Sequence, residues 1–166
     1  MDAKSEQSSE RYGLVPAETA ATMSGLELLQ GMIAGRFPGP PIMQLIGFHL
    51  AEVENGRAVF ESTPAFKHYN PLGTVHGGVI CDLVDAAMGT SHASLLDDGE
   101  SFTTLELKIN FMKPVWSGHL RAEGRVIKAG RTIGLVEGRV TDESGSLVAY
   151  ATSTCMTLRG DAAKGR

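Results

Sequence analysis

The chain has little cysteine and no excess of basic residues. Its 166 residues include only two cysteines, Cys81 and Cys155, and both stand among apolar neighbours. Two such thiols form neither a disulfide framework nor a CxxC metal motif, so we expect both to be buried in a reducing compartment. Lys and Arg number 15 against 19 Asp and Glu, a net charge of -4. This balance argues against a nucleic-acid or anionic-membrane surface, although a local basic site for a phosphorylated ligand stays open.

Long hydrophobic runs are also missing. No apolar stretch approaches the roughly 20 residues needed to span a bilayer. The first residues, "MDAKSEQSSERYG", lack the basic and apolar regions of a signal peptide. We therefore expect a cytoplasmic protein without a membrane partner. The histidines follow no ligand spacing, so we expect no metal site; they include His49, His68, His92 and His119.

The composition that remains, 42% hydrophobic, supports one core. We expect a single α+β domain over residues 17–159, with flexible tails at 1–16 and 160–166. Asn55-Gly56 is a strong hairpin signal between two alternating segments. The other expected elements are helices over 17–35 and 76–93, a loop over 64–75, and strands over 102–113, 118–128, 132–141 and 146–158.

The helix expected at 76–93 is apolar or small nearly all round, which is typical of a buried helix. It nevertheless carries two acids, Asp82 and Asp85. Asp82 lies near the positive end of the helix, where a carboxylate is stabilised without any functional role. Asp85 lies deeper, and a buried acid in a cleft is a candidate for a tuned pKa. We therefore assign function to Asp85 and not to Asp82.

Gly77 and Gly78 open this helix. Their N–H groups lie in the first turn, where we expect them to be unpaired, and no side chain blocks the approach of a ligand. Such donors suit a carbonyl oxygen that gains negative charge, although Gly-Gly can also serve only a sharp turn. Asp85 follows Gly77 by eight residues, about 12 Å along the axis. If both serve one reaction, the site spans two antiparallel helices of a two-fold dimer.

The segment Asn70–Gly78, "NPLGTVHGG", followed by Asp85, resembles the signature of hotdog-fold acyl-CoA thioesterases of the phenylacetate-degradation (PaaI-like) group. The segments "TTLELKINFMKPV" and "GRTIGLVEGRVTDESGSLVAYATST" extend the resemblance over roughly residues 40–158. It implies an antiparallel sheet wrapped round the central helix, and homodimers that often pair into tetramers. It also implies hydrolysis of an aryl- or medium-chain acyl-CoA without a metal or another cofactor.

The resemblance also implies roles for individual residues. The Gly77 N–H would polarise the thioester carbonyl, and Asp85 of the partner subunit would act as general base or nucleophile. Asn70 would position the water or the thioester, and His76 would orient Asn70 or the thioester side of the pocket. Thr104 matches a position whose hydroxyl holds the water or the acid. Asn70 could otherwise be a turn residue before Pro71, and Thr104 an ordinary strand residue.

Four further residues are candidates for substrate binding. Gly78 would offer a second N–H, His68 would line the pocket entrance, and Arg131 would contact a CoA phosphate. Phe48 would wall the acyl pocket together with Phe37, Met43 and Ile46, unless these are plain core. Two other functions stay open: an acyl-CoA-binding protein without turnover, and a hotdog enoyl-CoA hydratase or dehydratase. The second is disfavoured because Arg36 stands where that family has its catalytic His.

Overall fold

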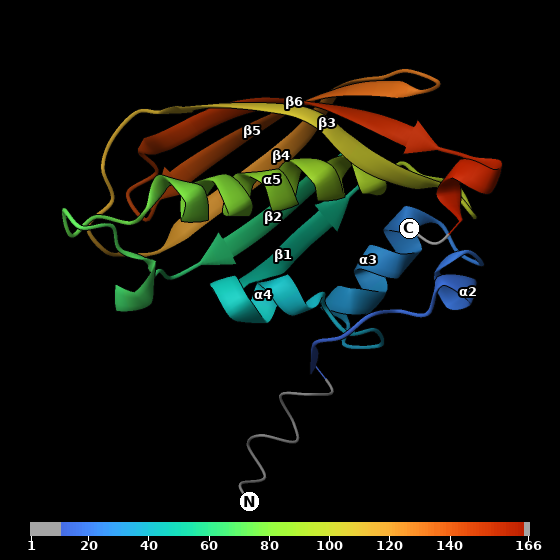
Figure 1. Cartoon of the computed structure of the whole chain (residues 1–166), viewed down its shortest axis with the longest axis horizontal. Helices are drawn as coiled ribbons and strands as arrows, with labels where there is room; N and C mark the ends of the chain where they lie inside the picture. The colour runs from blue at the N-terminus through green and yellow to red at the C-terminus, as the bar shows by residue number, and fades with distance from the viewer. Residues whose placement is uncertain (1–10, 165–166) are drawn as a thin grey trace, which may run out of the picture.

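A computed structural model describes residues 11–164 of the chain. Within that range a six-stranded antiparallel sheet curves round one long helix, α5 (Figure 1). The strand order is β1-β2-β4-β5-β6-β3. The strands are β1 (Phe48–Glu54), β2 (Arg57–Ser62), β3 (Ser101–Phe111), β4 (Leu120–Ala129), β5 (Ile133–Asp142) and β6 (Leu147–Leu158).

The helices lie on the concave side and at one end of the sheet (Figure 1). They are α2 (Ala17–Ala20), α3 (Gly25–Ile33), α4 (Pro41–Ile46) and α5 (Gly77–Ala93), with 3-10 turns η1 (Phe66–His68) and η2 (Gly160–Ala163). The predicted hairpin, central helix and four later strands are thus confirmed within a few residues. In the part of the chain that the structure describes, no helix is both long and apolar enough to cross a membrane.

The single helix predicted over 17–35 is wrong, because the segment forms two helices. Ser24 starts the second one with a capping box: its hydroxyl accepts the Glu27 N–H at 3.3 Å, and Glu27 accepts the Ser24 N–H at 2.9 Å. This reciprocal pair satisfies two of the free donors of a helix start. Of the predicted tails, residues 1–10 and 165–166 lie outside the described range, and the domain boundaries stay predictions.

Helix α5 packs very closely on the middle of the sheet. A Cβ atom at Gly124 of β4 would lie 2.3 Å from the Ala87 carbonyl oxygen, and one at Gly138 of β5 would lie 2.5 Å from Val84. Both contacts require glycine, because no side chain fits between the helix and the strands. They fix the position of α5, and with it the position of the acids that α5 carries.

Strand β3 forms one edge of the sheet and pairs only with β6 among the described residues. Leu105, Phe111 and the following Met112 are each more than half exposed. An edge strand of 11 residues offers free backbone groups for pairing with another strand. Within this fold, β3 is therefore open to a partner.

Candidate active site

The first turn of α5 is a capped helix terminus with one free donor. His76 is the N-cap residue, and its Nδ1 accepts the Gly78 N–H at 2.9 Å. The His76 carbonyl accepts the Val79 and Ile80 N–H groups at 3.0 and 3.4 Å. Within residues 11–164, the Gly77 N–H has no hydrogen-bond acceptor. The expectation of two unpaired N–H groups is therefore wrong for Gly78, because His76 already occupies that donor.

Asn70 holds the loop that leads into this turn. Its Oδ1 accepts the N–H groups of Leu72 and Thr74 at 2.9 and 3.3 Å, and its Nδ2 donates to the Thr74 hydroxyl at 2.8 Å. These bonds are those of a turn-forming Asn. In the single chain the side chain of Asn70 thus acts on its own loop, which ends at His76 and Gly77.

Asp85 lies in a different place, on the wall of a cavity of about 900 Å³. Its Oδ1 is buried and has no hydrogen-bond partner among the described residues. Burial raises the pKa of this carboxyl, and the negative charge of Asp82, which borders the same cavity, raises it further. A carboxylate without a partner in apolar surroundings is costly, so it indicates a site prepared for something else.

Thr104, predicted to hold the water or the acid, and Phe48, predicted to wall the acyl pocket, border this cavity too. Thr104 sits opposite Cys155, and a β-bulge follows it between Thr104 and Glu106. The Ser153 hydroxyl donates to the Glu106 carbonyl at 2.8 Å, which satisfies an acceptor beside the bulge. Bulges of this kind redirect side chains next to active sites. Here the bulge lies immediately after Thr104, which lines the same cavity as Asp85.

The predicted residues therefore fall into two groups on one chain. Asp85, Thr104 and Phe48 share the cavity, whereas Asn70, His76, Gly77 and Gly78 lie at the start of α5 and do not border it. Eight residues of helix, about 12 Å, separate the Gly77 N–H from the Asp85 position. One small reacting group cannot contact both within a single chain.

Comparison with known proteins supports the resemblance. Residues 72–149 match the Thioesterase superfamily. A candidate esterase of Saccharolobus solfataricus is 33% identical over 71% of this chain and 84% of its own length. The chain belongs to the thioesterase superfamily.

Two further relatives of this thioesterase-family chain bear on its activity and fold. Acyl-coenzyme A thioesterase 13 of Homo sapiens is 25% identical over 82% of this chain and 96% of its own length. The crystal structure of a candidate thioesterase of Ralstonia eutropha JMP134, a phenylacetic acid degradation-related protein, has a TM-score of 0.72. It is 31% identical and covers 77% of this chain and 98% of that chain. The predicted family, the hotdog fold and the prediction of a thioester hydrolase are confirmed.

Two of the predicted binding residues of this thioesterase lie away from the cavity. His68 is buried, with its Nδ1 accepting the Ala65 N–H at 2.9 Å and its carbonyl accepting the His76 N–H at 2.8 Å. Arg131 is exposed in the turn between β4 and β5, and its carbonyl accepts a hydrogen bond from Arg159. Arg159 pairs at 2.5 Å with Glu100, which does border the cavity. The binding roles of His68 and Arg131 stay predictions.

Sequence reasoning missed most of the cavity wall. Met43 and Phe48 border the cavity as expected, but Phe37 and Ile46 do not. Instead the wall includes residues of α3, and small residues of α5 beyond Asp85. The small residues of α5 could have been found from the sequence, because Ala86, Gly89 and Thr90 follow an i, i+3, i+4 spacing. Which element would pack opposite it could not be read from the chain.

Proposed function

We propose that the protein hydrolyses acyl-CoA thioesters with an aryl or medium-chain acyl group, at a site made by two copies of the chain. One observation carries the proposal: Asp85 lines a largely apolar cavity, and its buried Oδ1 has no hydrogen-bond partner among residues 11–164. The similarity to an acyl-coenzyme A thioesterase supports CoA as the thiol component.

In this proposal the two groups of residues supply complementary parts of one reaction. The Gly77 N–H donates to the thioester carbonyl oxygen and stabilises the negative charge that develops there. Asp85 of the partner subunit either removes a proton from the attacking water or attacks the carbonyl carbon itself. In both routes the C–S bond breaks, the thiolate leaves with the electron pair, and water supplies the oxygen of the free acid. Neither route uses a metal or another cofactor.

His76 and Asn70 act on this reaction through the first turn of α5. Because His76 caps Gly78, the Gly77 N–H is left as the free donor of that turn. Asn70 fixes the loop that leads to it. We regard both as positioning residues, and Thr104 as a hydroxyl placed to hold the water near Asp85.

The open edge of β3 supports the dimer. Pairing of two β3 strands about a two-fold axis would continue the sheet and cover the exposed Leu105 and Phe111. It would also bring the two α5 helices together in antiparallel orientation, since α5 lies across the same sheet. The start of one helix then approaches the middle of the other. Pairing of such dimers into a tetramer is part of the proposal.

The decisive experiment compares Asp85→Asn with the wild type on a panel of aryl- and acyl-CoA esters, with a thiol reagent detecting free CoA. We expect Asp85→Asn to lower kcat by about a thousandfold, within the range for loss of a general acid or base. The control is Asp98→Asn, the same change at an exposed position outside the cavity, which should leave kcat unchanged. Full activity of Asp85→Asn, or no turnover of any ester by the wild type, would reject the proposal.

A further inference from the structure

A second groove lies along β1, at the edge of the sheet opposite β3. We call it the β1 groove. It has a volume of about 700 Å³, within the range of sites for small molecules. The N-terminal segment, the end of α3 and β1 form its walls, with Arg11, Tyr12, Ile33, Phe37, His49 and Leu50 among the lining residues. Because the proposed dimer pairs β3 with β3, the β1 groove stays open in it.

The β1 groove combines an apolar interior with a basic rim. Met43 and Leu50 are buried, whereas Arg11 and His49 are exposed. Among residues 11–164, no Asp or Glu lines the groove. The His49 Nε2 already lies 3.7 Å from a carboxylate oxygen of Glu61, so Arg11 is the cation that a ligand can use. Such a surface is complementary to a molecule with an apolar body and one negative charge.

The backbone of Arg11 is held at the groove by a short bridge. The Arg11 carbonyl accepts the Gly39 N–H at 3.0 Å, and the Gly13 N–H donates to the Gly39 carbonyl at 2.9 Å. Tyr12, between them, packs against the core, and the Arg11 guanidinium lies 5.8 Å from the centre of the Tyr12 ring. A guanidinium can bind a carboxylate through two parallel hydrogen bonds, so Arg11 favours a carboxylic acid as the ligand.

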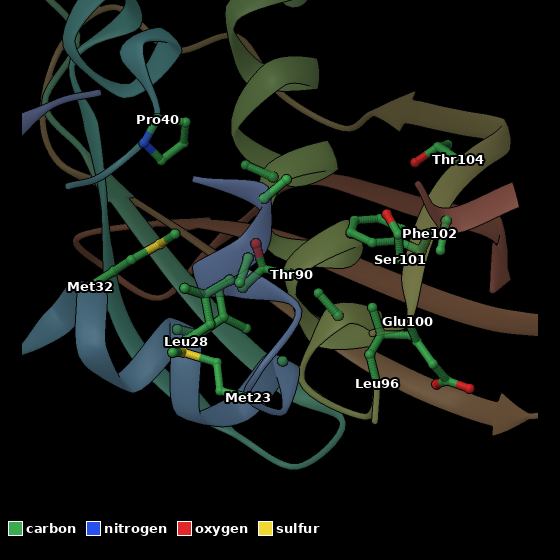
Figure 2. Close-up of a pocket in the computed structure, with 18 of the residues that line it drawn as sticks. Met23, Leu28, Met32, Pro40, Thr90, Leu96, Glu100, Ser101, Phe102 and Thr104 are labelled. Atoms are coloured by element: carbon green, nitrogen blue, oxygen red, sulfur yellow. The ribbon is translucent and has the colours of Figure 1, made fainter. Parts of the chain in front are cut away.

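Two methionines separate the β1 groove from the cavity that Asp85 borders. Met32 of α3 and Met43 of α4 line both. Figure 2 shows Met32 on the α3 side of the Asp85 cavity, with Phe102 and Thr104 of β3 on the other side. Methionine side chains are unbranched and adapt their shape to their neighbours. A ligand in the β1 groove therefore contacts side chains that also bound the Asp85 cavity.

We propose that the β1 groove binds a monocarboxylic acid with a medium-length apolar chain, and that this binding weakens acyl-CoA binding in the Asp85 cavity. The carboxylate pairs with Arg11, and the chain lies against Phe37 and Leu50. The bound acid presses Met32 and Met43 toward the cavity and leaves less room there for the substrate. An acid of this class is what the proposed reaction releases, so the product slows its own formation; this last step rests on the proposed thioesterase function.

Calorimetry of the full chain with octanoate, octan-1-ol and acetate tests the site. Octan-1-ol lacks the charge and acetate lacks the chain, so both should bind at least tenfold more weakly than octanoate. Arg11→Gln should weaken octanoate binding at least tenfold, the effect of losing a charged hydrogen bond, and Arg11→Lys should restore part of it. Ala34→Phe, at an exposed position that lines the groove, should fill the groove and abolish binding. Lys128→Gln, exposed and outside the groove, is the control and should change nothing.

The thioester assay tests the coupling between the two sites. As octanoate is added, KM should rise to a plateau about fivefold higher while kcat stays constant, and Arg11→Gln should remove this rise. A KM that rises without a plateau would mean that octanoate competes in the Asp85 cavity, and this overturns the proposal. So does an unchanged KM, or octanoate binding that neither Arg11→Gln nor Ala34→Phe affects.

Binding separates this inference from the proposed function. If the wild type hydrolyses no ester, calorimetry of a non-hydrolysable thioether analogue of an acyl-CoA, with and without octanoate, measures the same coupling. A weaker affinity for the analogue in the presence of octanoate, lost in Arg11→Gln, would support the groove although the thioesterase proposal had failed. An affinity that octanoate does not change would overturn the groove independently of turnover.

Discussion

The Nδ1 atom of His76 accepts the Gly78 N–H at 2.9 Å, so His76 caps α5 and leaves Gly77 as its free donor. Loss of an N-cap costs about 1 kcal/mol of stability, and His76→Ala should lower Tm by about 2–4 °C in a domain of this size. His76→Ala should also lower kcat, because the first turn of α5 is then less well fixed. His76→Asn provides another strong capping side chain and should return both Tm and kcat to about the wild-type values. Thermal unfolding and the thioester assay measure the two. If His76→Asn is stable but inactive, the imidazole does more than cap the helix.

A substitution at Gly77 can remove the N–H and leave the helix intact. Proline is well accommodated at the first helical position, and His76, with φ -62° and ψ 134°, has the extended conformation required before proline. We expect Gly77→Pro to lower kcat by about a hundredfold, the effect of losing one oxyanion donor.

The control for this change is Gly77→Ala, which keeps the N–H. A Cβ atom at Gly77 lies 3.0 Å from the end of the Phe111 ring, so a ring shift of a few tenths of an ångström accommodates it. Gly77→Ala should therefore retain most of the activity. Equal losses in the two variants would mean that crowding, rather than the missing N–H, is responsible.

A shared site also predicts complementation between inactive variants. A dimer made only of Asp85→Asn chains, or only of Gly77→Pro chains, has no intact site. When the two are unfolded together and refolded as a 1:1 mixture, half of the dimers combine one chain of each kind, and one of their two sites is complete. We expect about a quarter of wild-type activity if subunits pair at random. A mixture as inactive as its components would show that each chain forms its own site.

Much of the architecture that supports these expectations follows from local sequence. Asn55-Gly56 specifies the β1–β2 hairpin because Gly56 adopts a φ of 72° that other residues resist. The bounds of α5 and the alternation in β4 to β6 are equally local. The position of Asp85 within an apolar helix singled it out as the candidate acid, and the structure places it on the wall of a cavity.

The features that escaped prediction depend on contacts between distant segments. The cap on Gly78 depends on the rotamer of His76, and the bulge after Thr104 depends on register against β6. Helix α3 docks at the end of α5 through Gly25, whose N–H donates to the Leu96 carbonyl at 3.0 Å although more than sixty residues separate the two in the chain. No periodicity within either helix specifies that contact.

The charge on Asp82 should shift the acid limit of activity. Burial raises the pKa of Asp85 above its usual 3.8, and Asp82 raises it further. Because the proposed reaction requires Asp85 as a carboxylate, kcat/KM should fall as pH drops through this raised pKa. Asp82→Asn removes one repelling charge, so the pKa of Asp85 should decrease and activity should persist to lower pH. Because burial remains, this pKa should still lie above the usual 3.8 of an aspartate. A pH profile of both proteins measures the shift, and an unchanged or upward-moving profile contradicts the assignment.

The same raised pKa makes Asp85 a cost to folding at neutral pH. A carboxyl with a folded-state pKa above its unfolded value binds its proton more tightly in the native state. Its favourable contribution is complete below the unfolded value near 3.8 and is lost as pH rises through the folded value. Asp85→Asn removes the buried charge and should stabilise the protein at pH 7 by about 1 kcal/mol, as substitutions that relieve a functional site commonly do. Near pH 3 the Asp85 carboxyl is mostly protonated and neutral, as the amide of the variant always is, so the gain in stability should vanish.

Denaturant unfolding at pH 7 and pH 3 measures this difference, with Asp98→Asn as the exposed control that should show no gain at either pH. A loss of stability in Asp85→Asn at pH 7 would mean that the carboxylate has a favourable partner in the assembled protein.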